Sequence, residues 1–217
     1  MNKLEKVYCR TYQTIFKLAL PFLPYRTPEV VGSVKKLPEI IRREKCGNVL
    51  IITDAQIMKL GLIRRLEKAL TDAGIPYTVY DGTVANPTTE NVADALALYQ
   101  ENGCDAIIGF GGGSSMDCAK AVGARAVKPK QSLAQMKGIL KVRKKLPLLM
   151  AVPTTAGTGS ETTLAAVITD AQTRHKYAIN DFPLIPRYAV LDPKVTLRPP
   201  PFVTANTGMD ALTPGVE

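Results

Sequence analysis

Short apolar runs alternate with segments of helical periodicity along most of this chain. The runs at 49–53, 106–108 and 148–152 are mostly or wholly apolar, as expected for strands covered on both faces. Further strands are predicted at 77–80, 164–169, 176–179 and 188–191. Helices are predicted at 4–20, 30–43, 58–73, 89–101 and 118–127. Strands that alternate with helices predict an α/β fold with a parallel sheet.

A glycine-rich stretch, Gly109 to Asp117, separates the predicted strand at 106–108 from the helix that follows. Glycine lacks a Cβ, so another group can approach its backbone closely, and the start of a helix carries unpaired N–H groups that suit a phosphate. Three consecutive glycines exceed what a simple turn needs. A phosphate site is therefore predicted, and a capping box of Ser114 and Asp117 is an alternative that is compatible with it.

Two other polar features follow predicted strands. Asp54 comes directly after the run at 49–53, and a turn rich in threonine and glycine, from Pro153 to Glu161, follows the run at 148–152. Ligands of open parallel sheets bind beyond the carboxyl ends of the strands, so the three features together fit a dinucleotide. Asp54 could accept hydrogen bonds from a ribose and repel a 2′-phosphate, which favours NAD over NADP. The alternatives are a helix N-cap for Asp54 and an ordinary turn for the threonines.

The composition is that of an ordinary globular protein, with 217 residues, 46% hydrophobic and 22% charged. The formal net charge is +9, and seven bases fall between 128 and 145. This basic segment could attract nucleic acid, but no aromatic residues alternate with the bases, so a solvated loop and helix face is favoured. The four cysteines form no CxxC pair, and no segment is long and apolar enough to span a bilayer. We expect a cytoplasmic protein with neither nucleic-acid nor membrane partners.

Five motifs together resemble the iron-containing (group III) alcohol dehydrogenases. They are Gly111-Gly112-Gly113-Ser114-x-x-Asp117, the turn from Pro153 to Glu161, Asn86-Pro87-Thr88, Ile168-Thr169-Asp170 and Gly208-Met209-Asp210-Ala211-Leu212-Thr213. The resemblance implies a Rossmann-like, dehydroquinate synthase-like dinucleotide-binding domain, which in the family precedes a helical metal-binding domain. Glycerol dehydrogenases and dehydroquinate synthases share this architecture, but the threonine-rich turn fits the alcohol dehydrogenases better.

The resemblance also implies roles for individual residues. Asp54 would meet the adenosine ribose, and Asn86 would line the cofactor cleft. Gly112, Gly113 and Ser114 would hold the pyrophosphate. Asp117 would lie near the nicotinamide side, and Lys176 near the nicotinamide ribose. The opposite lip of the cleft would consist of Thr154, Thr155 and Thr158.

The metal site implied by the resemblance is incomplete in this sequence. Asp210 matches the first family ligand, but Pro214 stands where the family has a histidine, and the chain has only one histidine, His175, in a charged turn. One carboxylate is not a transition-metal site. We therefore expect the Fe²⁺ or Zn²⁺ of the family to lack a complete site here, and the C-terminal helical metal domain to be absent.

These observations predict an N-terminal arm at 1–46, a dinucleotide-binding domain at 47–201 and the start of a truncated helical domain at 202–217. The resemblance implies an oxidoreductase that interconverts small alcohols with aldehydes or ketones by hydride transfer, of which this chain is the cofactor-binding half. The chain alone is expected to be inactive. The alternatives are a nucleotide-binding module without catalysis and a nucleic-acid binder, for which charge is the only support. A homodimer is also expected from the resemblance.

Overall fold

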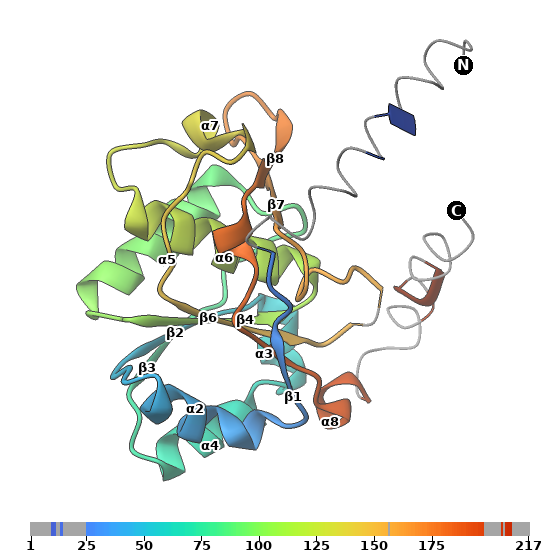
Figure 1. Cartoon of the computed structure of the whole chain (residues 1–217). Coiled ribbons are helices and arrows are strands. Elements are labelled where there is room, and N and C mark those ends of the chain that lie inside the picture. The colour runs from blue at the N-terminus through green and yellow to red at the C-terminus, as the bar shows by residue number, and fades with distance from the viewer. Residues whose placement is uncertain are drawn as a thin grey trace.

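The computed structural model describes residues 10–11, 14, 25–155, 157–197, 205 and 207–209. Within these residues, six strands form one sheet in the order β1-β9-β6-β4-β2-β3, and every neighbouring pair is parallel (Figure 1). The strands are β1 (Glu29–Val31), β2 (Val49–Ile52), β3 (Tyr77–Tyr80), β4 (Ala106–Gly111), β6 (Leu148–Pro153) and β9 (Tyr188–Val190). The predicted parallel α/β fold is confirmed.

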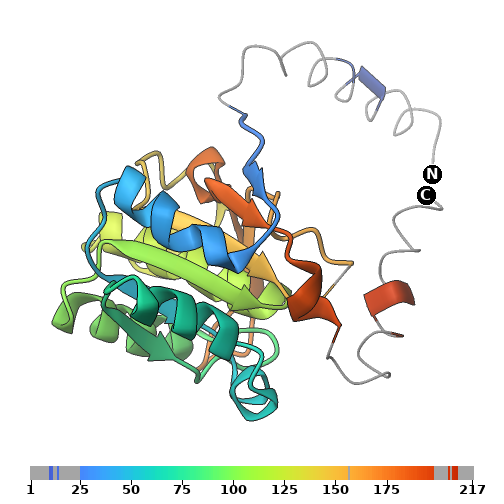
Figure 2. The same ribbon diagram turned by 90° about the horizontal axis from the view of Figure 1, so that it is seen from below.

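Helices cover both faces of this sheet (Figures 1 and 2). One face carries η2 (Val34–Lys36), α2 (Leu37–Arg43) and α4 (Arg64–Asp72), and the other carries α5 (Thr89–Glu101) and α6 (Gly113–Val127). Each face of the sheet has its own hydrophobic core, and alternate side chains of β2 belong to one or the other. Leu50 and Ile52 pack with α5 and α6, whereas Val49 and Ile51 pack with α2 and α4. This burial on both faces explains why β2 is an unbroken apolar run.

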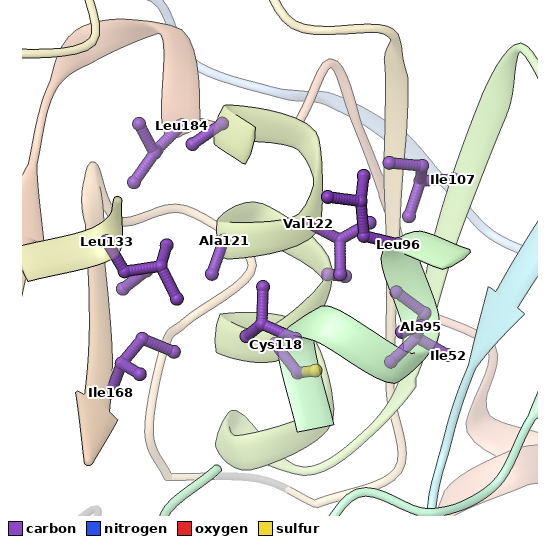
Figure 3. Packing of buried hydrophobic residues seen from close by; sticks show 14 of the residues in the cluster. Ile52, Ala95, Leu96, Ile107, Cys118, Ala121, Val122, Leu133, Ile168 and Leu184 are labelled. Atoms are coloured by element: carbon purple, nitrogen blue, oxygen red, sulfur yellow. The ribbon is translucent and has the colours of Figure 1, made fainter. Parts of the chain in front are cut away.

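A smaller sheet lies beyond α6. Within the described residues it has the order β5-β8-β7, with β5 (Gly138–Ile139), β7 (Ala165–Thr169) and β8 (Lys176–Asn180). Figure 3 shows Ile168 of β7 and Leu133 of α7 (Leu133–Met136) beside α6, in the same apolar cluster as its residues Cys118 and Ala121. Because α6 packs on β4 and on β7, it connects the two sheets.

The strand order reverses between β2 and β4. The chain passes from β2 outward to β3 and then returns to the other side of β2 as β4. A helix begins within three residues of the end of each strand: α3 (Ala55–Leu60) follows β2 and α6 follows β4. Such a reversal opens a crevice at the carboxyl ends of the strands, where ligands of this fold class bind.

Two predicted helices were wrong in part. Glu29–Val31 is strand β1, paired with Tyr188–Val190, so the helix predicted at 30–43 is confirmed only from residue 37 onward, after the short helix η2. The helix predicted at 58–73 is two helices, α3 and α4, because Gly61 adopts the left-handed conformation (φ 64°) and ends α3. Part of the predicted arm therefore belongs to the packed sheet.

Several of the remaining elements differ from the prediction in extent: α6 begins at Gly113 rather than at 118, and β4 extends to Gly111 rather than 108. The elements α7, β5, η3 (Phe182–Leu184) and α8 (Pro193–Thr196) were not predicted. Other elements agree closely. Thr88 caps α5 through a capping box with Asn91, and β7, β8 and β9 lie within a residue of their predicted bounds. The chain continues through η3 before β9 and α8 after it. Most of the predicted helix at 4–20 and of the segment 202–217, including Asp210 and Pro214, lies outside the described residues.

Candidate cofactor site

A cleft of about 580 Å³ opens at the carboxyl ends of β2, β4 and β6. It brings together seven of the ten residues predicted to bind the cofactor: Asp54, Gly112, Gly113, Ser114, Thr154, Thr155 and Thr158. Apolar side chains, among them Ile57, Leu62 and Val84, form another part of its wall. The cleft thus combines backbone and hydroxyl groups on one side with an apolar slot beside Asp54.

Asp54 is the N-cap of α3, as its alternative interpretation stated. Its Oδ1 accepts a hydrogen bond from the backbone N–H of Ile57 at 2.9 Å. Its Oδ2 accepts a long hydrogen bond from the hydroxyl of Ser115 at 3.5 Å. The cap uses only part of the acceptor capacity of a carboxylate. Asp54 also lines the cleft, so capping does not exclude contact with a ligand.

The glycine turn presents backbone rather than side chains to the cleft. Gly111 has φ 149°, and a Cβ there would lie 2.6 Å from the hydroxyl of Ser115, so only glycine fits. A Cβ on Gly112 would point toward Thr155, at 3.5 Å from its Oγ1. No side chain caps the start of α6 at Gly112. As at any helix start, the first N–H groups of α6 have no partner within the helix, and they could donate to an anion in the cleft.

The predicted capping box of Ser114 and Asp117 is wrong. The hydroxyl of Ser114 accepts from the backbone N–H of Asn86 at 3.3 Å. The carboxylate of Asp117 instead accepts from the hydroxyl of Ser160 at 2.7 Å and from the N–H of Val167 at 3.0 Å. Both side chains therefore tie the glycine turn to distant segments rather than to their own helix.

The threonine-rich turn stands opposite the glycine turn. The backbone N–H of Thr154 donates to the carbonyl of Gly111 at 3.0 Å, which continues the β4–β6 pairing into the two turns. Within the described part of the chain, Thr155 Oγ1 is buried without a hydrogen-bond partner. A buried hydroxyl without a partner is costly, and this one lies at the wall of the cleft, where a ligand oxygen could pair with it.

The other three predicted residues, Asn86, Asp117 and Lys176, line a second cavity of about 400 Å³. Gly113, Ser114 and Thr158 line both cavities, so the two are adjacent. Lys176 Nζ donates to Asn86 Oδ1 at 2.6 Å, and Asn86 is held at φ 58°. The site is thus an elongated region that runs from Asp54, past the two turns, to Lys176.

Lys120 is a buried cation behind this second cavity that was not predicted from the sequence. Its side chain is fully buried, and Nζ lies 3.8 Å from Asp117 Oδ1. Burial lowers the pKa of Lys120 to about 8, although Asp117 and Glu161 act in the opposite direction. Burial also raises the pKa of Asp117, against the effects of Lys120 and of its hydrogen bonds. The sequence signal was a lysine three residues after Asp117 on an otherwise small and apolar helix.

The described residues do not fit a metal centre. No three side chains among His, Cys, Asp and Glu of this part of the chain lie close enough to hold an ion. His175, the single histidine in the sequence, is exposed and its Nε2 lies 3.0 Å from Lys137 Nζ. A transition-metal site of the histidine-rich type therefore cannot be assembled from these donors.

Other parts of the described surface carry fewer chemical features. Six of the seven bases of the segment 128–145 are exposed, and Lys128 is half-buried. Cys104 and Cys118 are buried free thiols, and Cys46 is half-buried. None of the described helices has the length and apolarity that crossing a bilayer requires.

Comparisons with known proteins agree with this geometry. A family model described as iron-containing alcohol dehydrogenase matches residues 28–193. The probable alcohol dehydrogenase EutG of Escherichia coli K12 is 39% identical over 186 residues, which are 86% of this chain and 47% of that protein. The crystal structure of a 1,3-propanediol oxidoreductase has a TM-score of 0.85 at 35% identity, over 89% of this chain and 51% of that one.

A third similarity concerns a structure solved with a cofactor. A sulfoacetaldehyde reductase from Bifidobacterium kashiwanohense, in complex with NAD⁺, has a TM-score of 0.77 at 28% identity, over 89% of this chain and 52% of that one. The chain spans about half the length of the relatives it matches.

Proposed function

Since the chain belongs to the iron-containing alcohol dehydrogenase family, we propose that its cleft binds NAD(H) and that the chain is the cofactor-binding half of an oxidoreductase acting on small alcohols and aldehydes. One observation carries the proposal. Among the described residues, no side chain caps the helix start in the glycine turn, and Thr155 Oγ1, a buried hydroxyl of the threonine-rich turn on the opposite side of the cleft, has no hydrogen-bond partner. A phosphate between these turns would accept N–H groups on one side and a hydroxyl on the other.

The shape of the cleft supports one orientation of the cofactor. The apolar wall formed by Ile57, Leu62 and Val84 suits an adenine ring, and the carboxylate of Asp54 beside it suits the hydroxyls of the adjacent ribose. The pyrophosphate would then lie at Gly112, Gly113 and Ser114. The nicotinamide half would extend into the second cavity, where Asn86, Asp117 and Lys176 lie.

In this orientation the residues of the chain bind and orient rather than react. Bound NAD(H) would supply the hydride, and the protein would position it. The Lys176–Asn86 hydrogen bond gives the second cavity a fixed polar edge. The positive charge of Lys176 would favour an electron-rich ribose or phosphate oxygen over an apolar group.

The proposal contains no metal-dependent step, because the described donors do not form a metal site. The alternative function is a nucleotide-binding module without catalysis. The two functions differ in one measurable respect. With ethanol or 1,2-propanediol, NAD⁺ and added Fe²⁺ or Zn²⁺, a catalytic chain produces NADH, whereas a binding module takes up NADH but produces none.

The first test is a calorimetric titration with NADH and NADPH. Because Asp54 caps α3, an alanine there would remove both the cap and the carboxylate, whereas Asp54→Ser keeps a good capping hydroxyl. We expect Asp54→Ser to weaken NADH binding about tenfold and to weaken NADPH binding less, since the carboxylate no longer accepts from the ribose or repels a 2′-phosphate.

The matched control is Asp72→Ser, which removes an exposed carboxylate paired with Lys68 on α4. It should leave both affinities unchanged. If wild type fails to bind NADH at millimolar concentration, the proposed function is wrong. If Asp54→Ser binds NADH as well as wild type does, Asp54 acts only as a cap.

The predicted domain division, homodimer and cytoplasmic location stay predictions. We propose that the dinucleotide-binding unit begins near residue 28 rather than 47, because β1 is a strand of the six-stranded sheet and α2 packs on one face of that sheet. A homodimer would give twice the monomer mass in sedimentation equilibrium.

A further inference from the structure

The ammonium group of Lys120 is enclosed by acceptors from one short segment. Lys120 lies in the middle of α6 and its side chain is fully buried. Nζ donates to Ala165 O at 2.8 Å, to Thr163 Oγ1 at 2.9 Å, and to Thr163 O and Ser160 Oγ at 3.1 Å each. An ammonium has only three donors, so these contacts use all of them.

Asp117 completes the network from the same helix. Its Oδ1 lies 3.8 Å from Lys120 Nζ and accepts the hydroxyl of Ser160 at 2.7 Å. Its Oδ2 accepts the N–H of Val167 in β7. Ser160 therefore bridges the two charged groups. Burying such groups is unfavourable unless they are paired and fully hydrogen-bonded, which is the condition met here.

The segment that these groups hold, Ser160 to Ala165, directly continues the threonine-rich turn. Ser160, Thr163 and Ala165 line the second cavity together with Asp117 and Lys176. Thr154 at the other end of the turn is anchored by its hydrogen bond to Gly111. Between these anchors lie Thr155 and Thr158, whose side chains face Gly112 and Gly113.

We propose that Lys120 is a positioning residue of the cofactor cleft. Its buried ammonium holds the segment Ser160–Ala165 against α6, and this contact sets the distance between the threonine-rich turn and the glycine turn. The inference rests on the proposed function of the cleft. An apolar side chain could fill the same volume, but it could not fix the positions of four oxygen atoms in one segment.

The network is not symmetric with respect to the cleft. Its hydrogen bonds reach Ser160, Thr163 and Ala165 on the side of the second cavity. Among the described residues, no hydrogen bond of Lys120 reaches Asp54 or α3. Loss of the network should therefore loosen the part of the site proposed for the pyrophosphate and nicotinamide. The part proposed for the adenosine should keep its geometry.

The test compares NADH with AMP, which carries only the adenosine end and one phosphate. The variants are Lys120→Met, Ser160→Ala and the control Lys68→Met, whose lysine is exposed on α4. Calorimetry should show NADH affinity reduced about tenfold or more in Lys120→Met, since small displacements of positioning groups have large effects. AMP affinity should fall by a smaller factor, about threefold at most, because AMP reaches the loosened part of the site only with its phosphate, and its adenosine end lies away from the network.

Ser160→Ala keeps the lysine and removes only the bridging hydroxyl, so it tests the network even if Lys120→Met fails to fold. It should weaken NADH binding in the same direction and by a smaller factor, and Lys68→Met should leave both affinities unchanged. Hydrogen–deuterium exchange should become faster at residues 159–165 in Lys120→Met and Ser160→Ala, and remain unchanged at residues 50–60.

Each result decides the matter. If Lys120→Met and Ser160→Ala lower NADH and AMP affinity by equal factors, or leave NADH affinity unchanged, the positioning role is overturned while the proposed function stands. If wild type binds neither NADH nor AMP, the proposed function fails and this inference fails with it.

Discussion

Gly112 lines the cleft with backbone atoms only. The methyl group of a Gly112→Ala variant therefore tests whether the ligand occupies the space beside this residue. Gly112 has φ −80° and ψ −170°, which any residue can adopt, and an added Cβ would lie at ordinary contact distance from Thr155. Gly112→Ala should therefore fold, with a loss of about 1 kcal/mol at most for the poorer helix N-cap. The methyl group would occupy the space proposed for the pyrophosphate, so NADH affinity should fall about tenfold or more.

The control for this prediction is Gly32→Ala, where an added Cβ meets no atom within 4 Å. Calorimetry gives the affinities, and urea unfolding gives the stabilities. NADH affinity within about twofold of wild type in Gly112→Ala would contradict a phosphate position at the glycine turn.

Cys118 is a buried thiol whose ionisation is linked to the stability of the fold. Figure 3 shows Cys118 on α6, between Ala95 of α5 and Ile168 of β7. Burial raises the pKa of Cys118 to about 12, from 9.0 for an ordinary thiol. Above pH 9 the unfolded thiol loses its proton and the folded one keeps it, so the unfolded state becomes relatively more favourable as pH rises. Each pH unit above 9 costs about 1.4 kcal/mol from this group.

Urea unfolding at several pH values between 8 and 10 checks this linkage. By pH 10, Cys118→Ala should have lost about 1.4 kcal/mol less than wild type, relative to each protein at pH 8. Equal losses in both proteins would show that Cys118 ionises as easily in the folded state as in the unfolded one. Iodoacetamide labelling and peptide mapping at pH 8 should also leave Cys118 unmodified in the folded protein.

At the scale of elements, the sequence predicted what local patterns determine. β2 and β6 were found because continuous apolar runs are needed for burial on both faces, and α5 was found from Thr88 and its periodicity. β1 was missed because its three residues carry no pattern of their own, and its strand state comes from pairing with β9, far along the chain. The break at Gly61 was missed because buried Leu62, Leu66 and Leu70 continue the apolar pattern across it.

The candidate site was predictable to a similar extent. Both turns were recognised by composition, and the structure gathers their residues at adjacent cavities. The links between them were not recognisable. Lys120 and Ser160 are forty positions apart, and the contact of Lys176 with Asn86 spans ninety. Such contacts follow from how α6, β7 and β8 pack, and a lysine or serine alone gives no indication of its partner.

At the scale of the whole molecule, cofactor binding and folding are thermodynamically linked. The proposed ligand contacts α3, the glycine turn and the threonine-rich turn, which follow β2, β4 and β6 of the main sheet. Unfolding separates these segments, so an unfolded chain has no site and NADH stabilises only the folded state. At a free NADH concentration one hundred times Kd, the free energy of unfolding should rise by about 2.7 kcal/mol.

For a unit of this size, that increase corresponds to a rise of roughly 5–10 °C in the unfolding midpoint Tm. Differential scanning calorimetry with increasing NADH should show Tm rising with the logarithm of ligand concentration. Asp54→Ser should follow the same curve displaced to higher concentration, since the variant changes affinity and keeps the cap of α3. If NADH leaves the Tm of wild type unchanged at concentrations that saturate the calorimetric titration, NADH binds the folded and the unfolded chain equally well. A cleft assembled from three separate segments would then not be its binding site.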